Sequence, residues 1–356
     1  MKAIRYERYG APEVLRLEDT GDPAVGDEDV LIRVLAASVN PLDWHFMRGI
    51  PYILRPQAGL LRPKDGVLGA DMAGRVEEVG KHVTAFAPGD EVFGCVAGLG
   101  TLAEYISVHE DAVVLPKPAN QTFAQAASVP LAASTALQAL RDQGHIQPGH
   151  KVLVNGAAGG VGTFTVQIAR ALGAEVTGVC GTGNTEMVAS IGASQVIDYT
   201  RQDFTHTRQR YDLLVDVAGN RPLGACRRIL TDQGILVGVG GPNKGRWIGP
   251  MTRAIKALLL SRVINQKVTF FLAKPNRDDL AVLRDLLLAG KISPVIDRTY
   301  PFNEVPEAIR YLEQGHARGK VVITVLRRLT VRGGTVRIRS GRLPYIRRRR
   351  SRLNRS

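Results

Sequence analysis

The chain has 356 residues, of which 44% are hydrophobic, and a formal net charge of +14. A chain of this length is longer than a single hydrophobic core usually accommodates, so two domains are predicted. No run of apolar residues approaches the roughly 20 that a membrane-spanning helix needs. The three cysteines lie far apart without C-x-x-C spacing, which excludes a disulfide framework and favours three buried small residues.

The charge is concentrated at the C-terminal end. Twelve arginines and no acidic residue lie within 327–356, so residues 1–326 carry a net charge of only +2. We expect residues 327–356 to form an Arg-rich disordered tail, because they lack a sustained apolar period. Such a tail can bind nucleic acid by charge alone, but we favour a solvated extension without a role or the product of an altered reading frame.

The first 120 residues predict a mostly β region. Residues 1–10 lack the apolar segment of a secretory signal and suggest a first strand, so we expect a cytoplasmic protein without membrane contact. Further strands are expected in runs punctuated by glycine and proline, at residues 30–35, 73–79, 91–94 and 103–108. Prolines 116 and 118 mark a boundary, after which an Ala-rich helix is expected from 122 to about 141.

From residue 150 onward, strands alternate with helices. The expected strands are 151–155, 175–180, 195–199, 213–217 and 235–239, and the expected helices between them are 163–172 and 186–191. Apolar strands that are buried on both faces and alternate with helices predict a doubly wound parallel sheet. Strands at 292–296 and 320–325, with a helix at 305–312 between them, are expected to close the fold.

The strongest motif is the glycine-rich turn NGAAGGVG, residues 155–162, between an expected strand and an expected helix. Backbone N–H groups at a helix N-terminus bind a pyrophosphate when glycines allow close approach. The motif therefore predicts a dinucleotide site at Ala158, Gly159, Gly160 and Val161, an ordinary strand–helix connection being the alternative.

The loop after the second strand bears on the choice between NAD and NADP. NAD-binding proteins usually place a carboxylate there for the ribose hydroxyl, whereas residues 179–184 read VCGTGN. The absence of an acid favours NADPH. Against this, the loop offers no Arg or Lys for a 2′-phosphate, and Glu186 lies nearby.

Six segments together resemble the medium-chain dehydrogenase/reductase superfamily, in its zinc-free quinone oxidoreductase-like branch, over about residues 1–326. They are SVNPLDW (38–44), GADMAGRVEEVG (69–80), PGDEVFG (88–94), the glycine-rich turn, IGASQVIDY (191–199) and GKVVI (319–323). The resemblance implies an α/β fold in which a Rossmann domain with a doubly wound parallel sheet is joined to a GroES-like, mostly β catalytic domain. The expected domains are 1–121 with 296–326 (catalytic) and 122–295 (NADP-binding), with a cleft between them and a homodimeric assembly.

The same resemblance bears on metal binding. In zinc alcohol dehydrogenases a Cys sits where this chain has Asn40, and a His–Glu pair sits at Ala70 and Asp71. Because catalytic zinc needs three suitable protein ligands, we expect no metal and little alcohol oxidation. A quinone or α,β-unsaturated carbonyl needs only orientation and a hydrogen-bond donor. We therefore expect NADPH-dependent reduction of a small hydrophobic electrophile.

The resemblance also implies individual site residues. Asn40 corresponds to the family's active-site Asn, with a turn-forming role before Pro41 as the alternative, and Asp43 is expected to orient a neighbour. The proton donor stays open between Tyr52, His45 and water; Tyr52 belongs to the apolar loop 48–64, the expected substrate mouth. The remaining expected cofactor contacts are Thr135 near the nicotinamide ribose, Asn184 and Tyr199 at the 2′-phosphate, and Phe271 and Leu272 near the carboxamide. Thr182 and Val239 are also expected to contact the cofactor.

Several of these positions have alternatives. Thr135 and the 270–272 segment also fit ordinary core or surface positions, and Asn184 replaces a Lys of NADPH-using relatives. Two other functions stay open. One is an NADPH-binding protein with a mainly non-enzymatic role in binding nucleic acid or a partner, and the other, more remote, is an alcohol or aldehyde oxidoreductase.

Overall fold

The computed structural model describes residues 1–52, 55–64, 66–96, 100–239 and 266–325, together with 330, 331, 334 and 335. Residues Met1–Val325 form one compact unit, and Leu326–Ser356 form a second. In the second unit, β16 (Thr330–Val331) pairs antiparallel with β17 (Gly334–Thr335). The rest of the expected tail lies outside the described residues.

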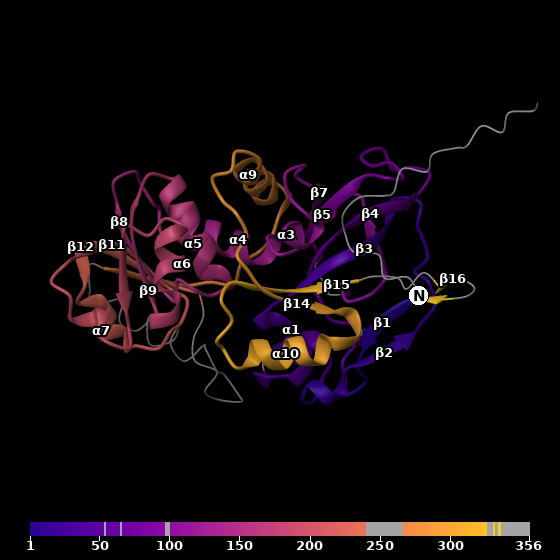
Figure 1. Cartoon of the computed structure of the whole chain (residues 1–356), viewed down its shortest axis with the longest axis horizontal. Helices are drawn as coiled ribbons and strands as arrows, with labels where there is room; N and C mark the ends of the chain where they lie inside the picture. Colours follow the sequence, from indigo (N-terminus) through magenta and orange to yellow (C-terminus); the bar gives the residue numbers. More distant parts are fainter. Residues whose placement is uncertain are drawn as a thin grey trace, which may run out of the picture. The chain divides into compact units, whose positions relative to one another are not determined.

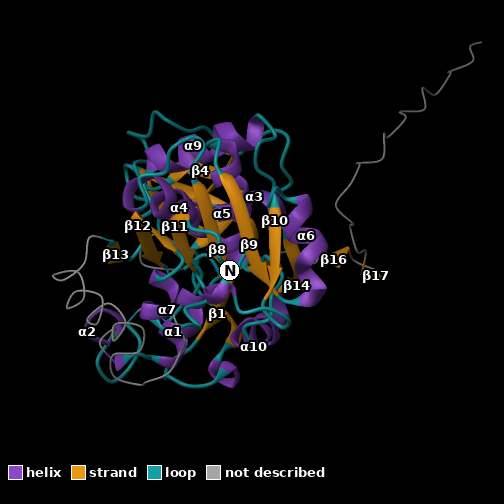
Figure 2. Ribbon diagram, turned by 90° about the vertical axis from the view of Figure 1, so that its left-hand side faces the viewer, coloured by secondary structure: helices purple, strands orange, loops and turns teal. Residues whose placement is uncertain are grey.

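A six-stranded parallel sheet forms one half of the larger unit in the described part of the chain (Figure 2). Its order is β10-β9-β8-β11-β12-β13, and each neighbouring pair runs parallel. The strands are β8 (Lys151–Asn155), β9 (Glu175–Cys180), β10 (Gln195–Asp198), β11 (Tyr211–Asp216), β12 (Leu230–Gly238) and β13 (Lys267–Phe270). The strand order changes direction between β8 and β11, so the expected doubly wound sheet is confirmed.

The second large sheet combines N-terminal and C-terminal segments. Among the described residues its order is β14-β15-β3-β4-β5-β7, with β6 also paired to β3. These strands are β3 (Asp29–Val39), β4 (Asp71–Val79), β5 (Glu91–Cys95), β6 (Tyr105–His109), β7 (Val114–Pro116), β14 (Ile296–Pro301) and β15 (Lys320–Thr324). Figure 1 shows β15, late in the chain, beside β3, with which it pairs antiparallel. The expected GroES-like sheet is therefore present.

Short strands and helices complete the larger unit. Strand β1 (Lys2–Arg5) pairs antiparallel with β2 (Arg16–Asp19). The α-helices are α1 (Pro41–Arg48), α2 (Arg55–Ala58), α3 (Phe123–Ala127), α4 (Pro130–Gln138), α5 (Gly160–Ala171), α6 (Thr185–Ser190), α7 (Leu223–Arg227), α9 (Arg277–Leu288) and α10 (Val305–Glu313). Helix α5 places Phe164, Val166, Ile168 and Ala169 in the core of the parallel sheet. Helix α10 buries Val305, Ala308 and Ile309 in the core of the other sheet.

Three expected element boundaries are wrong. The helix expected from 122 to 141 is divided into α3 and α4, because Pro130 begins α4 and has no N–H to continue the hydrogen bonds of a single helix. The helix expected from residue 163 begins at Gly160, at the end of the glycine-rich turn. The strand expected at 292–296 is absent from these described residues, and β14 begins only at Ile296.

Composition also led to expectations about the three cysteines and about membrane-spanning segments. Cys95, Cys180 and Cys226 are buried, as expected, and none of them forms a disulfide within the described residues. Within the described residues, no helix has the length and the apolar character needed to cross a membrane.

Candidate functional site

The glycine-rich turn connects the carboxyl end of β8 to α5. The N–H groups of Gly156 and Ala157 both donate to the Val179 carbonyl, which fixes the turn against β9. A Cβ built on Gly162 would lie 2.0 Å from the Gly156 carbonyl oxygen, so this position requires glycine. The first N–H groups of an α-helix have no partner within the helix. The turn therefore offers the donors that a pyrophosphate needs.

The other expected cofactor residues of this domain follow carboxyl ends of the same parallel strands. Thr182 and Asn184 follow β9, Tyr199 follows β10, Val239 follows β12, and Phe271 and Leu272 follow β13. Because the strands run parallel, these segments share the edge at which α/β proteins bind dinucleotides. Their exposure differs: Phe271 is partly buried against the main core, whereas Leu272 is 87% exposed. The Val239 N–H donates to the Asp216 carbonyl at 3.1 Å.

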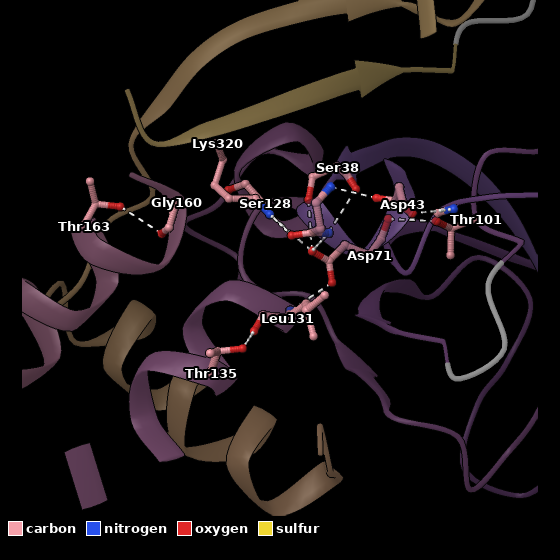
Figure 3. Close-up of polar contacts among 12 residues, drawn as sticks. Ser38, Asp43, Asp71, Thr101, Ser128, Leu131, Thr135, Gly160, Thr163 and Lys320 are labelled. Carbon is pink, nitrogen blue, oxygen red and sulfur yellow. Dashed lines mark hydrogen bonds and ion pairs between the residues drawn. The ribbon is translucent and has the colours of Figure 1, made fainter. Parts of the chain in front are cut away.

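A buried polar network surrounds Asp71 at the start of β4 (Figure 3). One carboxylate oxygen, Oδ2, accepts hydrogen bonds from the Ser38 hydroxyl and from the Asn40 amide, both at 3.0 Å. The other oxygen accepts the Leu131 N–H at 2.9 Å. Asp71 therefore connects the β3–α1 segment to helix α4.

Lys320, the first residue of β15, adds a cation to this network. Its side chain is 3% exposed, and its Nζ lies 2.5 Å from Asn40 Oδ1 and 3.5 Å from Asp71 Oδ2. Burial lowers the pKa of the Lys320 ammonium, and the nearby Asp71 and Asp43 carboxyls oppose that shift. Sequence reasoning missed this role. A lysine inside the apolar run GKVVI was the available signal, because lysine is seldom fully buried without a partner.

The strand that carries Lys320 also contacts the glycine-rich turn. The Gly319 N–H donates to the Ala158 carbonyl at 2.8 Å. A Cβ built on Gly160 would lie 3.1 Å from Cδ of Lys320, so the lysine stem lies against the turn. The start of β15 thus contacts both the dinucleotide turn and the polar network around Asn40.

Asn40 and Asp43 lie next to each other in the network. Asp43 accepts the N–H groups of Asn40 at 2.7 Å and of Gly69 at 2.9 Å, one with each oxygen. Burial raises the pKa of the Asp43 carboxyl to about 7, against the lowering effect of these two hydrogen bonds. The Asn40 amide is directed inward, towards Asp71 and Lys320. Asp43 thus connects the backbone at Asn40 to the backbone of the segment that precedes β4.

The remaining expected residues have local partners. The Thr135 hydroxyl donates to the Leu131 carbonyl within α4, one turn from the N–H that Asp71 accepts. The Arg55 guanidinium lies over the Tyr52 ring, 4.5 Å from its centroid. His45 Nδ1 lies 2.7 Å from the Ile50 carbonyl oxygen, and burial lowers the pKa of this histidine.

The residues at the zinc positions of related alcohol dehydrogenases do not fit a zinc ion. They are Asn40, Ala70 and Asp71, and the Lys320 ammonium already bonds Asn40 and Asp71. Catalytic zinc requires three ligands drawn from Cys, His and carboxylates. Across the ranges that the structure describes, no three His, Cys, Asp or Glu residues gather to hold a metal.

Two family models match the chain. The model described as "Alcohol dehydrogenase GroES-like domain" matches residues 26–119. The model described as "Zinc-binding dehydrogenase" matches residues 191–323. The first match covers most of the strands of the sheet that holds Asp71, and the second extends from the region of β10 to Lys320.

Similar proteins cover nearly the whole chain. It is 36% identical to the mitochondrial NAD(P)H oxidoreductase RTN4IP1 of Mus musculus, over 92% of this chain and 89% of that protein. It is 33% identical to the chloroplastic NADPH-dependent alkenal/one oxidoreductase of Arabidopsis thaliana, over 91% and 79% of the two chains. The solved quinone oxidoreductase of Coxiella burnetii matches with a TM-score of 0.80 and 30% identity, over 92% of this chain and 99% of that one.

Proposed function

The chain belongs to the medium-chain dehydrogenase/reductase superfamily, in its quinone oxidoreductase-like branch, and on that premise we propose a zinc-independent, NADPH-dependent oxidoreductase that reduces a quinone or an α,β-unsaturated carbonyl. The observation that carries the proposal is the contact of β15 with two places at once. Gly319 bonds the glycine-rich turn, and Lys320 bonds Asn40. The dinucleotide turn and the expected catalytic loop therefore adjoin the same strand.

The residues at the carboxyl ends of the parallel strands fit a dinucleotide. Backbone N–H groups of Gly160 and Val161 would hold the pyrophosphate, whereas the Gly159 N–H already donates to the Gly156 carbonyl at 3.1 Å. The requirement for glycine at 162 keeps that turn tight. Thr182, Asn184 and Tyr199 would hold the adenosine end, with Val239, Phe271 and Leu272 towards the nicotinamide. When bound, NADPH supplies the hydride, whereas the protein supplies orientation and electrostatics.

The network around Asn40 supports reduction of an activated carbonyl. Its buried cation, Lys320, is fixed by Asn40 and Asp71, and such preorganised charge favours developing negative charge nearby. A quinone or enone needs no metal to become electrophilic, unlike an alcohol that must first be ionised. The printed names of the alkenal/one oxidoreductase and the quinone oxidoreductase agree with this substrate class.

Titration of the full chain with NADPH and with NADH, followed by nicotinamide fluorescence, tests the cofactor. Tighter binding of NADH would contradict the proposal. A panel of quinones, enones, aldehydes and alcohols then tests the substrate class, with NADPH or NADP⁺ consumption as the measurement. Zinc analysis of the purified protein tests the metal, and one bound zinc per chain would overturn zinc independence.

Replacement of Asn40 by Ala tests the expected catalytic loop. We expect turnover to fall by about tenfold or more, because the Asn40 amide is one of the groups that fix the Lys320 cation. NADPH affinity should change far less. Asn120→Ala is a matched control, since Asn120 donates to the Leu287 carbonyl, outside this network. Equal turnover in the Asn40→Ala and Asn120→Ala variants would contradict a catalytic role for Asn40.

Assembly and location stay proposals. We propose a homodimer, as the family resemblance implies, and size-exclusion chromatography with light scattering measures its mass. A cytoplasmic location also stays a prediction, since the names of RTN4IP1 and of the alkenal/one oxidoreductase place those relatives in mitochondria and chloroplasts.

A further inference from the structure

The loop after β9 lacks a basic residue in sequence, yet a guanidinium lies against it in the structure. A Cβ built on Gly183 would lie 3.2 Å from an Nη atom of Arg318 and 3.9 Å from its Cζ. Arg318 comes from the segment before β15, far along the chain from this loop. Gly183 therefore leaves the space in which the guanidinium approaches the loop backbone.

Two further polar groups lie at the same loop. A Cβ built on Gly181 would lie 3.2 Å from the Tyr199 hydroxyl, which places that hydroxyl over the loop. The Asn184 side-chain oxygen is buried, and it has no hydrogen-bond partner among the residues that the structure describes. A buried polar atom without a partner is costly. The loop thus presents a guanidinium and a hydroxyl beside an amide whose oxygen lacks a partner.

The backbone holds Arg318 at this place. Its N–H donates to an Asp297 carboxylate oxygen at 2.9 Å. The next residue, Gly319, donates to the Ala158 carbonyl of the glycine-rich turn and has a φ of +92°, which favours glycine. The Arg318 side chain is exposed, and within the described ranges it forms no ion pair. Its guanidinium is therefore available to an anion beside the dinucleotide turn.

A carboxylate that contacts this loop, Asp198, is already engaged. Asp198 accepts the Thr182 hydroxyl at 2.6 Å and the Thr200 hydroxyl at 2.7 Å, and it pairs with Arg201 at 3.5 Å. The Thr182 hydrogen bond is the main reason that the pKa of Asp198 is lowered, so the group is anionic near neutral pH. Its oxygens are occupied by threonine hydroxyls, which reduces its capacity to accept a ribose hydroxyl. Its charge also opposes any phosphate nearby, so phosphate binding here requires a cation.

We propose that Arg318 binds the 2′-phosphate of NADPH, with Gly183 admitting the guanidinium and Tyr199 donating its hydroxyl, and so selects NADPH over NADH. The inference rests on the proposed function and deepens it. A phosphate monoester carries about −1.5 to −2 charges near neutral pH, and a guanidinium matches its oxygens with paired donors. NADH lacks this group, so Arg318 contributes little to its binding.

The test measures binding, independently of turnover. Calorimetric titrations of the full chain with NADPH, NADH, adenosine 2′,5′-bisphosphate and AMP compare wild type with Arg318→Met, which keeps the aliphatic stem. We expect the affinities for NADPH and for the bisphosphate to fall by about ten- to a hundredfold. Affinities for NADH and AMP should stay within about twofold. Raised salt should weaken NADPH binding more in wild type than in the variant.

Two variants and a control sharpen the test. Arg318→Lys should bind NADPH more tightly than Arg318→Met, because the ammonium keeps the positive charge. It should bind NADPH less tightly than wild type, because the ammonium lacks the paired donors of the guanidinium. Gly183→Ala should reduce NADPH affinity but not NADH affinity, since its methyl group meets the guanidinium at 3.2 Å. Arg201→Met is the matched control, because Arg201 pairs with Asp198 at the same loop.

The outcomes separate the two proposals. A wild type that does not prefer NADPH contradicts the proposed cofactor, whatever the variants do. A wild type that prefers NADPH, with an Arg318→Met variant of unchanged preference, overturns the role of Arg318 alone. Equal loss of NADPH and NADH binding in Arg318→Met also overturns it, because the effect would not depend on the 2′-phosphate.

Discussion

Lys320 illustrates how a buried charge is stabilised by its partners. The ammonium is removed from water, a costly state that only matched partners offset. Asn40 supplies an amide oxygen and Asp71 a carboxylate, and Asp71 in turn accepts three hydrogen bonds from Ser38, Asn40 and Leu131. Removal of the Lys320 ammonium would therefore also destabilise the buried Asp71 carboxylate.

We expect Lys320→Met to lower the free energy of unfolding by about 3–5 kcal/mol, because Asp71 is left buried without its cation. Urea unfolding measures the change. The double variant with Asp71→Asn should recover part of the loss. Arg75→Met provides the exposed control, since the Arg75–Glu91 pair is half exposed and should contribute about 1 kcal/mol or less. A Lys320→Met variant no less stable than this control would contradict the buried-pair interpretation.

Asp43 predicts a pH dependence of stability. Its pKa is 3.8 when unfolded and about 7 when buried, so the folded state retains a proton that the unfolded state loses. The contribution of Asp43 is therefore fully present below pH 3.8 and is lost as the pH rises towards 7. The unfolding free energy of wild type, relative to Asp43→Asn, should fall by up to about 1.4 kcal/mol per pH unit in this window. A difference that is constant or rises with pH would contradict the raised pKa.

At the scale of elements, the glycine-rich turn combines a required glycine with a helix start. Gly162 lies in the first turn of α5, where a Cβ would meet the Gly156 carbonyl. The turn cannot accept that atom without moving its own backbone. Because the same backbone would hold the pyrophosphate, packing and binding depend on one residue.

We expect Gly162→Ala to abolish measurable NADPH binding and to destabilise the fold by about 1–3 kcal/mol, since the added methyl overpacks the turn. Gly224→Ala in α7 is the matched control, because a Cβ there meets nothing within 4 Å. That helical substitution should be neutral or stabilise by up to about 1 kcal/mol. Thermal unfolding and nicotinamide fluorescence check both variants. NADPH binding by Gly162→Ala at wild-type affinity would contradict the tight-turn argument.

Local patterns predicted the turn and the parallel strands, because the relevant residues are adjacent in sequence. The polar network was not predictable in this way. Asn40 lies 31 residues from Asp71 and 280 from Lys320, so the pairing of β3 with β4 brings Asp71 to it and the pairing of β15 with β3 brings Lys320. Gly183 and Arg318 are also distant in sequence, and the segment before β15 reaches the parallel sheet through the contact of Gly319 with the glycine-rich turn. The predicted boundary of a helix was wrong where a single residue determines it, as Pro130 does at the start of α4.

At the scale of the whole molecule, the larger compact unit and most of the excess positive charge belong to different parts of the chain. The compact unit ends at Val325, whose side chain is buried and whose N–H donates to the Leu35 carbonyl. Residues 1–326 carry a net charge of +2, whereas residues 327–356 carry twelve arginines. Electrostatic binding to polyanions should therefore reside almost entirely in the last thirty residues.

Deletion of residues 327–356 should leave the melting temperature within about 1 °C and NADPH affinity unchanged, because the compact unit stays complete. Retention on heparin or duplex DNA should be lost, and retention of the full chain should fall steeply with salt. Differential scanning calorimetry and salt-gradient elution make the measurements. Salt-insensitive retention, or retention by the shortened chain, would place nucleic-acid binding elsewhere.

The pairing of β15 with β3 has a consequence for synthesis. Strand β3 is complete once residue 39 has left the ribosome, but its partner β15 ends only at residue 324. Strand β6 covers the first half of this edge, but residues 36–39 of β3 wait for β15 throughout that interval and form an open strand edge, a site for mispairing with other chains. The N-terminal sheet therefore stays incomplete at this edge until β15 has emerged. Fragments that stop before β15 should aggregate, and chaperone dependence should be greatest for chains stalled between these two points.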